Sequence, residues 1–199
     1  MSPADVEGVA EPRTRPRRAD AQRNRDLLLA AAKDVFTEQG VDAPLDDIAR
    51  RAGVGNATMY RHFPTRSDLI VAVYADEVAA LCARGDELAA TCEPREALFS
   101  WLADFIAHVT GKKELALAVA DDRTGARSTL FGQWHTAMHT TAATLLAGAQ
   151  RAGVVRADLD VPDLLSLANG IALSGASPNR LDRLLALVRE GVEVRAQRS

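Results

Sequence analysis

The sequence is poor in cysteine and contains no long apolar run. Its two cysteines, Cys82 and Cys92, are too few for a disulfide framework among 199 residues, and no histidines stand near them at zinc-ligand spacing. We interpret them as thiols of a reducing compartment rather than as a redox switch. No apolar run approaches the ~18–20 residues of a membrane span, and residues 1–18 lack the apolar core of a signal peptide. These absences predict a cytoplasmic protein with no membrane partner.

Aromatic residues are also scarce, at 5% of the chain, and no segment alternates apolar and polar residues as a half-buried strand does. Hydrophobic residues at 47% and charged residues at 26% are ordinary for a globular protein. Because no strand pattern occurs, we expect an all-α fold. Helical spacing of apolar residues, with proline and glycine at the breaks, predicts helices over 19–38, 44–51, 56–63, 67 to about 84, 94–109, 113–120, 127–152, 161–175 and 178–195.

Composition divides the chain into three regions. Residues 1–18 contain Pro3, Pro12 and Pro16, scattered charges and no hydrophobic period, which predicts a disordered arm that ends in arginines. Residues 19–66 hold three of the expected helices, and residues 67–199 hold the others. We therefore expect a small N-terminal three-helix domain followed by a larger helical domain.

Two short helices joined by a tight turn at Gly53 have the pattern of a helix-turn-helix unit, whose second helix can enter the major groove of DNA. The expected seam between them is apolar, with Ile48 and Ala49 facing Met59 and Val54 filling the turn. Opposite the seam, the expected recognition helix over about 56–62 carries side chains of the kind that read base edges and hold phosphates, namely Asn56, Thr58, Tyr60, Arg61 and His62.

The segment DDIARRAGVGNATMYRHFPTRSDLI, residues 46–70, resembles the DNA-binding signature of TetR-type transcriptional regulators. The preceding segment NRDLLLAAAKDVFTEQG is similar to the first helix of that family, so the specific resemblance covers residues 20–75. Beyond residue 80 it is architectural, and it implies a divergent helical domain for ligand binding and dimerisation. The segment AGVVRADLDVPDLLSLANGIAL also resembles a pattern common in one subgroup.

Position by position, the resemblance implies which residues contact DNA. Asn56, Ala57 and Thr58 correspond to base-contacting positions, and Arg61 to a variable position that contacts a base or a phosphate. The positions that hold the DNA backbone are occupied by Tyr60, His62 and Arg66, the last in place of a frequent lysine.

Two departures from the family pattern affect these contacts. Many relatives have a phosphate-binding threonine where Ala43 or Pro44 stands, and lysine-glycine where Asn56-Ala57 stands. The first change loses or relocates a phosphate contact. The second removes a charge but supplies an amide that can pair with adenine.

The basic arm gives a second indication of DNA binding. Between Arg13 and Arg25 lie six arginines, Arg17 and Arg18 among them, against one acid, Asp20. Such an arm can enter the narrow minor groove beside the recognition helix, although a solvated tail that only aids solubility would look the same. The net charge of −3 argues against a nucleic-acid partner, but residues 13–66 alone carry +4.

The second domain has aromatic residues on two expected helices. Trp101, Phe105 and His108 share one face, while Phe131, Trp134, His135 and Met138 cluster on another helix. The resemblance implies a ligand cavity in this region, where such residues suit an apolar small molecule. The alternative interpretation is that they form the core.

His135 and His139 stand one helical turn apart, a spacing that can chelate a metal ion. No carboxylate or cysteine lies nearby in sequence to complete a site. We therefore expect no metal ligands and no cofactor.

The last two expected helices carry more apolar surface than packing on their own domain requires. In the resembling family the corresponding helices pair across a two-fold axis as a four-helix bundle, which implies a homodimer that binds a two-fold operator. The residues that we assign to this interface are Leu164, Leu167, Ile171, Leu181, Leu184, Leu185 and Val188.

The function predicted from these features is a sequence-specific transcriptional regulator. We expect a repressor that leaves a palindromic DNA operator when a small-molecule effector binds. An enzyme is disfavoured because the chain has no nucleophile elbow, no phosphate-binding glycine loop and no paired carboxylates with a histidine on a shared face. A non-specific architectural DNA binder remains an alternative.

Overall fold

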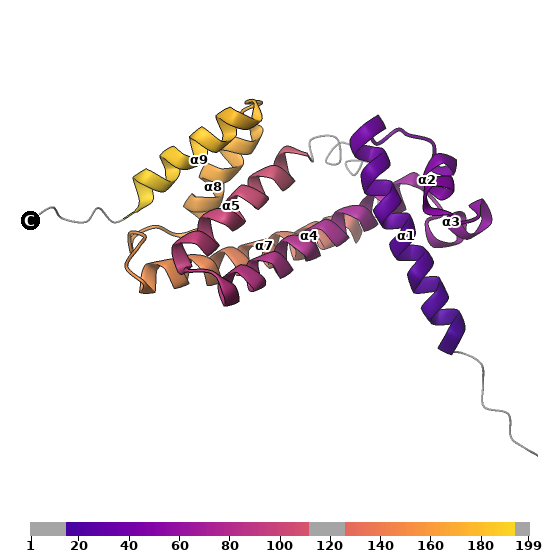
Figure 1. Ribbon diagram of the computed structural model, residues 1–199, viewed down its shortest axis with the longest axis horizontal. Coiled ribbons are helices and arrows are strands. Elements are labelled where there is room, and N and C mark those ends of the chain that lie inside the picture. The colour runs from indigo at the N-terminus through magenta and orange to yellow at the C-terminus, as the bar shows by residue number, and fades with distance from the viewer. Residues whose placement is uncertain (1–14, 112–125, 194–199) are drawn as a thin grey trace, which may run out of the picture. The chain divides into compact units, whose positions relative to one another are not determined.

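The structure is a computed structural model that describes residues 15–111 and 126–193. Eight helices lie in these ranges: α1 (Arg15–Gln39), α2 (Leu45–Ala52), α3 (Asn56–His62), α4 (Arg66–Thr91), α5 (Pro94–Thr110), α7 (Ala126–Arg151), α8 (Val161–Leu173) and α9 (Pro178–Val192) (Figure 1). The only strand-like pairing among the described residues is an isolated bridge between Val155 and Glu193. The all-α prediction is confirmed.

The chain forms two compact units, Met1–Leu69 and Ile70–Ser199, here called the first and second unit. The boundary falls inside α4, three residues later than the expected boundary at residue 66. Leu69 is fully buried and groups with the first unit, so α4 begins in one unit and continues in the other.

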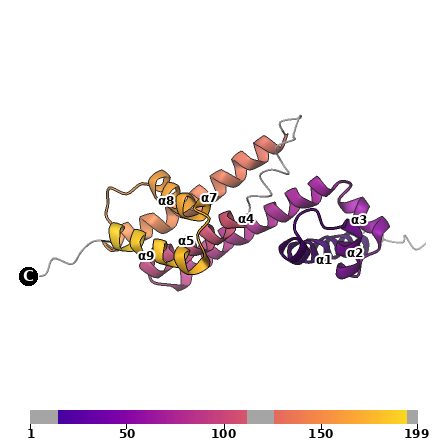
Figure 2. The same ribbon diagram turned by 90° about the horizontal axis from the view of Figure 1, so that it is seen from above.

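The first unit is built from α1, α2, α3 and the start of α4 (Figure 2). One face of α1 is apolar at helical spacing and buries Leu28, Ala32 and Val35. This face receives α2, whose Ile48 and Ala49 are fully buried. The small side chain of Ala49 allows the helices to approach closely.

The second unit has α5 packed against α7, α8 and α9 (Figure 1). Its core contains Leu98, Trp101 and Leu102 of α5 together with Leu145 of α7 and Leu164 of α8. Pro94, Pro162 and Pro178 stand in the first turns of α5, α8 and α9, where a missing N–H breaks no intrahelical bond. None of the described helices is long and apolar enough to cross a membrane.

Two helix limits differ from expectation. The helix expected from residue 19 begins at Arg15, so residues 15–18 are helical, which corrects the disordered arm at its C-terminal end. Arginine favours helix and Pro16 is tolerated in a first turn. The helix expected to end near Arg84 continues to Thr91, with Gly85 inside it. The expected helix over 113–120 lies outside the described residues.

Candidate DNA-binding surface

The turn between α2 and α3 is fixed by backbone hydrogen bonds. Gly53 has φ 66° and ψ 25°, a left-handed conformation that glycine adopts readily. Its N–H donates to the Arg50 carbonyl at 3.2 Å, and the N–H of Val54 donates to the Ala49 carbonyl at 3.0 Å. Buried Val54 fills the turn as predicted. The orientation of α3 relative to α2 is thereby defined.

An apolar seam holds α3 against the first unit. Met59 on α3 is fully buried, as are Ile48 and Ala49 on α2. Phe63, directly after α3, is also buried, and the guanidinium of Arg25 on α1 lies 5.9 Å from the centre of its ring. The opposite face of α3 is left exposed, with Asn56, Ala57, Tyr60 and Arg61 on it and Thr58 and His62 half-buried.

The long side chains on this face already make intramolecular hydrogen bonds. Nε of Arg61 donates to the Ala57 carbonyl at 3.0 Å, and its Nη2 lies 3.5 Å from Oγ1 of Thr58. The hydroxyl of Tyr60 donates to Oδ1 of Asp46, in the first turn of α2, at 3.4 Å. Donors expected to contact DNA are therefore directed along the exposed face by neighbours on the same two helices.

Arg66, which was assigned as a phosphate contact, makes hydrogen bonds within the first unit. It is partly buried, and its Nη1 donates to the carbonyls of Val41 at 2.7 Å and Ala43 at 2.5 Å. These bonds tie the start of α4 to the segment between α1 and α2. The sequence offered no indication of this structural contact, because a 25-residue separation carries no periodic pattern.

Arg17 and Arg18 lie in the first turns of α1. Arg18 is exposed. Sequence reasoning missed a charged pair at the opposite end of α1, in which Arg51 of α2 donates to both carboxylate oxygens of Glu38, at 2.6 and 2.7 Å. This bidentate contact lowers the pKa of Glu38 below its ordinary value and fastens α2 to α1 on the solvent side.

The residues assigned to a ligand cavity separate into different environments. Trp101 is fully buried, donates from Nε1 to the Leu81 carbonyl at 3.0 Å and stacks on buried Phe105. These two residues lie in the core of the second unit, and their contact with a ligand stays a prediction. Buried Met138 also belongs to this core.

A second aromatic group surrounds Tyr74 of α4, a residue that the sequence interpretation missed. Its ring centre lies 5.2 Å from His108, 5.8 Å from Phe131 and 4.9 Å from Trp134. Burial raises the pKa of the Tyr74 hydroxyl, and the neighbouring carboxylate of Glu77 adds to the shift. The structure thus joins three of the assigned residues around Tyr74.

His135 does not join that group. It is exposed on α7, and its ring centre lies 4.5 Å from that of His139. No group of three or more histidine, cysteine or carboxylate side chains suited to a metal ion occurs among the described residues.

The residues assigned to dimerisation also divide. Leu164 and Ile171 are buried in the second unit, because α8 is apolar on more than one face and this face packs on α5. Leu181, Leu184, Leu185 and Val188 are half-buried, while Leu167 is 45% exposed. Leu173 and Leu187, which the sequence interpretation left out, are 66% and 56% exposed.

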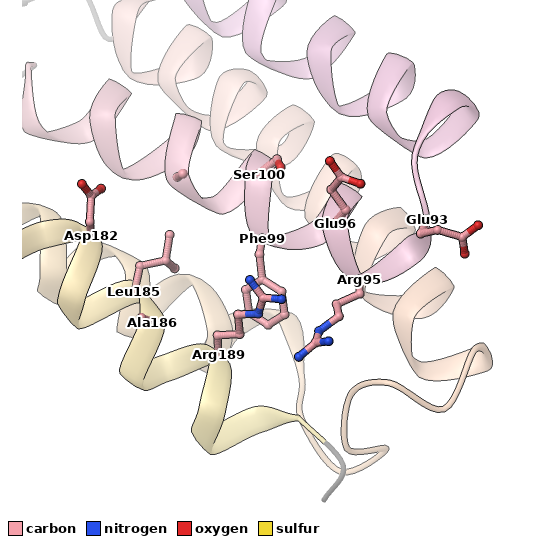
Figure 3. A pocket seen from close by; sticks show the side chains of 10 residues that line it. Glu93, Arg95, Glu96, Phe99, Ser100, Asp182, Leu185, Ala186 and Arg189 are labelled. Atoms are coloured by element: carbon pink, nitrogen blue, oxygen red, sulfur yellow. The ribbon is translucent and has the colours of Figure 1, made fainter. Parts of the chain in front are cut away.

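The second unit has two surface grooves along α9. One, of about 740 Å³, lies between α8 and α9, and Leu167, Leu184 and Leu187 are among its lining residues. The other, of about 690 Å³, lies between α5 and α9 (Figure 3). In that groove the guanidinium of Arg189 lies 5.3 Å from the centre of the Phe99 ring, and Arg95 and Arg189 both bind Glu193.

These features define a class of protein: a helix-turn-helix transcriptional regulator with a separate helical domain. Comparison with known families makes the assignment more specific. The family described as "Bacterial regulatory proteins, tetR family" matches residues 28–73, and the family "Transcriptional regulator SbtR-like, C-terminal domain" matches residues 93–194. The chain belongs to the TetR family of transcriptional regulators.

Solved structures agree with this assignment over most of the chain. A TetR transcriptional regulator from Streptomyces coelicolor is 40% identical, with a TM-score of 0.74, and the match covers 86% of this chain and 99% of that one. A TetR regulatory protein from Mycobacterium vanbaalenii is 36% identical, with a TM-score of 0.70 and coverage of 90% and 100%.

Among curated proteins the similarity is shorter. The HTH-type transcriptional regulator SrpR of Pseudomonas putida is 45% identical over 58 residues, which are 29% of this chain and 27% of SrpR. The matched segment thus spans about a quarter of that relative's length. Family and fold are those of DNA-binding transcriptional regulators, which are not enzymes.

Proposed function

We propose that this protein is a homodimeric repressor that leaves a palindromic operator when a small molecule binds its second unit. The observation that carries the proposal is the exposed face of α3, where Asn56, Tyr60 and Arg61 stand opposite a fully buried apolar seam. A helix held in this way can insert its polar face into the major groove without rearranging its own packing.

Dimerisation is supported by the exposed leucines of α8 and α9. Leu167 and Leu187 are exposed and line the same groove, and exposed apolar side chains grouped in this way are typical of an interaction surface. A second copy placed on this face would bury them in an isologous contact. Two recognition helices about 34–36 Å apart would then reach successive major grooves.

Effector control would act through α4. This helix begins in the first unit at Arg66, which binds the segment before α2, and continues through Tyr74 in the second unit. A ligand that binds near Tyr74 and favours one position of α4 would shift the population of dimers able to bind DNA. Coupling of ~1–3 kcal/mol would lower operator affinity by about 5- to 150-fold.

The proposal is tested by selecting duplexes that the protein retains from a random-sequence pool and measuring binding at several salt concentrations. A regulator should prefer one palindrome strongly over scrambled duplexes. Equal binding to both would indicate an architectural protein, and binding to neither would rule out a DNA-binding function.

Two substitutions on α3 test the assignment of the recognition helix. Tyr60→Phe should weaken binding to all duplexes by removing a phosphate contact. Asn56→Ala should relax preference at one base position by about 1–3 kcal/mol. Normal binding and normal preference in both variants would show that another element reads the DNA.

A further inference from the structure

Asp46 is an acidic side chain beside the exposed face of α3 that is expected to contact DNA. It stands in the first turn of α2, where the helix dipole favours a carboxylate. Its Oδ1 accepts a hydrogen bond from the hydroxyl of Tyr60 on α3 at 3.4 Å. Tyr60 as a whole is 47% exposed, so a ligand from solvent can approach its side chain.

The chemistry of the phenol makes these two partners competitors. A tyrosine hydroxyl has a single proton to donate. A carboxylate and a DNA phosphate are both anionic acceptors. The Tyr60 hydroxyl donates its hydrogen bond to Asp46 in the free protein and would donate it to a phosphate in the complex.

We propose that Asp46 limits DNA affinity by acting as an intramolecular substitute for phosphate. Binding to DNA must then exchange the Tyr60–Asp46 hydrogen bond for a Tyr60–phosphate bond, with Asp46 left solvated. The inference rests on the proposed function, because it takes Tyr60 as a phosphate contact. It adds a residue that sets affinity without affecting sequence preference.

The neighbouring residue Asp47 provides a matched control. It lies in the same first turn, but its Oδ1 is paired with Nη2 of Arg50 on its own helix, at 2.8 Å. Removing either carboxylate lowers repulsion toward DNA in a general way. Only removal of Asp46 also leaves the Tyr60 hydroxyl without its intramolecular hydrogen-bond acceptor.

The test is a double-mutant cycle between Asp46→Ala and Tyr60→Phe in the full-length protein. The probes are a 30-base-pair duplex selected by the wild-type protein and a scrambled duplex of equal length. Dissociation constants are measured at one salt concentration. Asp46→Asn serves as a second variant, and circular dichroism checks that each variant is folded.

We expect Asp46→Ala to raise affinity more in the wild-type background than in the Tyr60→Phe background. The excess should be about fivefold for a dimer, from a weak hydrogen bond of about 0.5 kcal/mol in each of two copies of the first unit. The excess should be the same on both duplexes, because a phosphate contact carries no sequence information. Asp47→Ala should show no such dependence on Tyr60.

Equal effects of Asp46→Ala in both backgrounds would overturn the inference, as would a Tyr60-dependent loss of affinity, which would mean that Asp46 positions the hydroxyl for DNA. Failure of the proposed function gives a different result, since the wild-type protein would then show no preference for the selected duplex.

Discussion

Replacing Gly85 with alanine should destabilise the second unit, although alanine is the better helix former. Gly85 lies inside α4, and a Cβ added there would lie well inside normal contact distance of Cγ2 of Thr141 on α7. It would also lie 3.1 Å from Cδ1 and Nε1 of Trp101, against ~3.5–4.0 Å for an optimal carbon–carbon contact.

Neither neighbour can move freely. Thr141 is buried, β-branched and bonded from Oγ1 to the Ala137 carbonyl at 3.2 Å. Trp101 is fully buried, and its indole N–H is committed to the Leu81 carbonyl. Displacing either one strains the core or breaks a buried hydrogen bond.

These contacts give the expected magnitude. Overpacking costs about 1–3 kcal/mol in a well-filled core, and the upper part of that range applies because two rigid groups are displaced. The higher helix propensity of alanine offsets about 1 kcal/mol. The net loss for Gly85→Ala should be about 1–2 kcal/mol.

Urea unfolding followed by tryptophan fluorescence measures this loss directly. Both tryptophans, Trp101 and Trp134, belong to the second unit, so the signal reports on that unit. Protein concentration must be held constant, because the proposed dimerisation would make stability concentration-dependent. A lower midpoint with an unchanged slope gives the change in free energy of unfolding.

Two further variants isolate the cause. Gly132→Ala on α7 should stabilise by about 0.5–1 kcal/mol, since nothing lies within 4 Å of a Cβ there. Thr141→Ser removes the clashing methyl group and should recover part of the loss in Gly85→Ala. If Gly85→Ala unfolds at the same urea concentration as Gly132→Ala, the close approach of α4 and α7 does not exist.

Three other substitutions test other contacts. Arg66→Met removes charge-assisted hydrogen bonds to two backbone carbonyls, so it should destabilise the first unit by about 2 kcal/mol. Amide hydrogens between α1 and α2 should then exchange faster. Reduced DNA affinity at unchanged stability would mean that Arg66 acts mainly on phosphate. Glu193 has a lowered pKa because Arg95 binds its carboxylate, so stability from this pair is complete above the ordinary glutamate pKa of about 4.3 and is lost as pH falls through the lower folded-state value. Acid titration of unfolding should therefore show a smaller decrease for Glu193→Gln, and identical curves would contradict the assignment. Leu187→Glu should yield a monomer by light scattering, whereas Leu27→Glu, at an exposed leucine of the first unit, should remain dimeric.

Local patterns were sufficient to predict the helices of residues 15–111 and 126–193, apart from the start of α1 and the end of α4, and to predict the helix-turn-helix unit. Gly53 between two short apolar-faced segments specifies a tight turn, and Ile48, Ala49 and Met59 are buried where their spacing placed them. Such features depend on residues a few positions apart, which share a face by geometry alone. The assigned DNA contacts on α3 accordingly stand on an exposed face, and their roles stay predictions.

Contacts between distant segments were not predictable in the same way. Trp101 is of a residue type that often lines ligand cavities, yet its indole N–H donates a hydrogen bond to the carbonyl of Leu81, twenty positions earlier. Leu164 and Ile171 belong to a helix with apolar residues on several faces, and periodicity does not say which face meets the same chain and which meets a partner. The packing of α5 on α8 in the structure shows which face of α8 meets the same chain.

The distribution of charge constrains how the protein can approach DNA. Residues 1–12 carry −3, residues 13–66 carry +4 and residues 67–199 carry −4, which together give the net charge of −3. At separations beyond the Debye length of about 8 Å at physiological salt, this net charge is screened and gives no long-range attraction. At shorter separations the nearest charges dominate, so attraction develops only when residues 13–66 face the duplex. Encounters in other orientations are repelled by the acidic second unit. Sequence discrimination must therefore come from short-range contacts of α3, whereas Asp46 on neighbouring α2 changes the local charge and with it the affinity for any duplex.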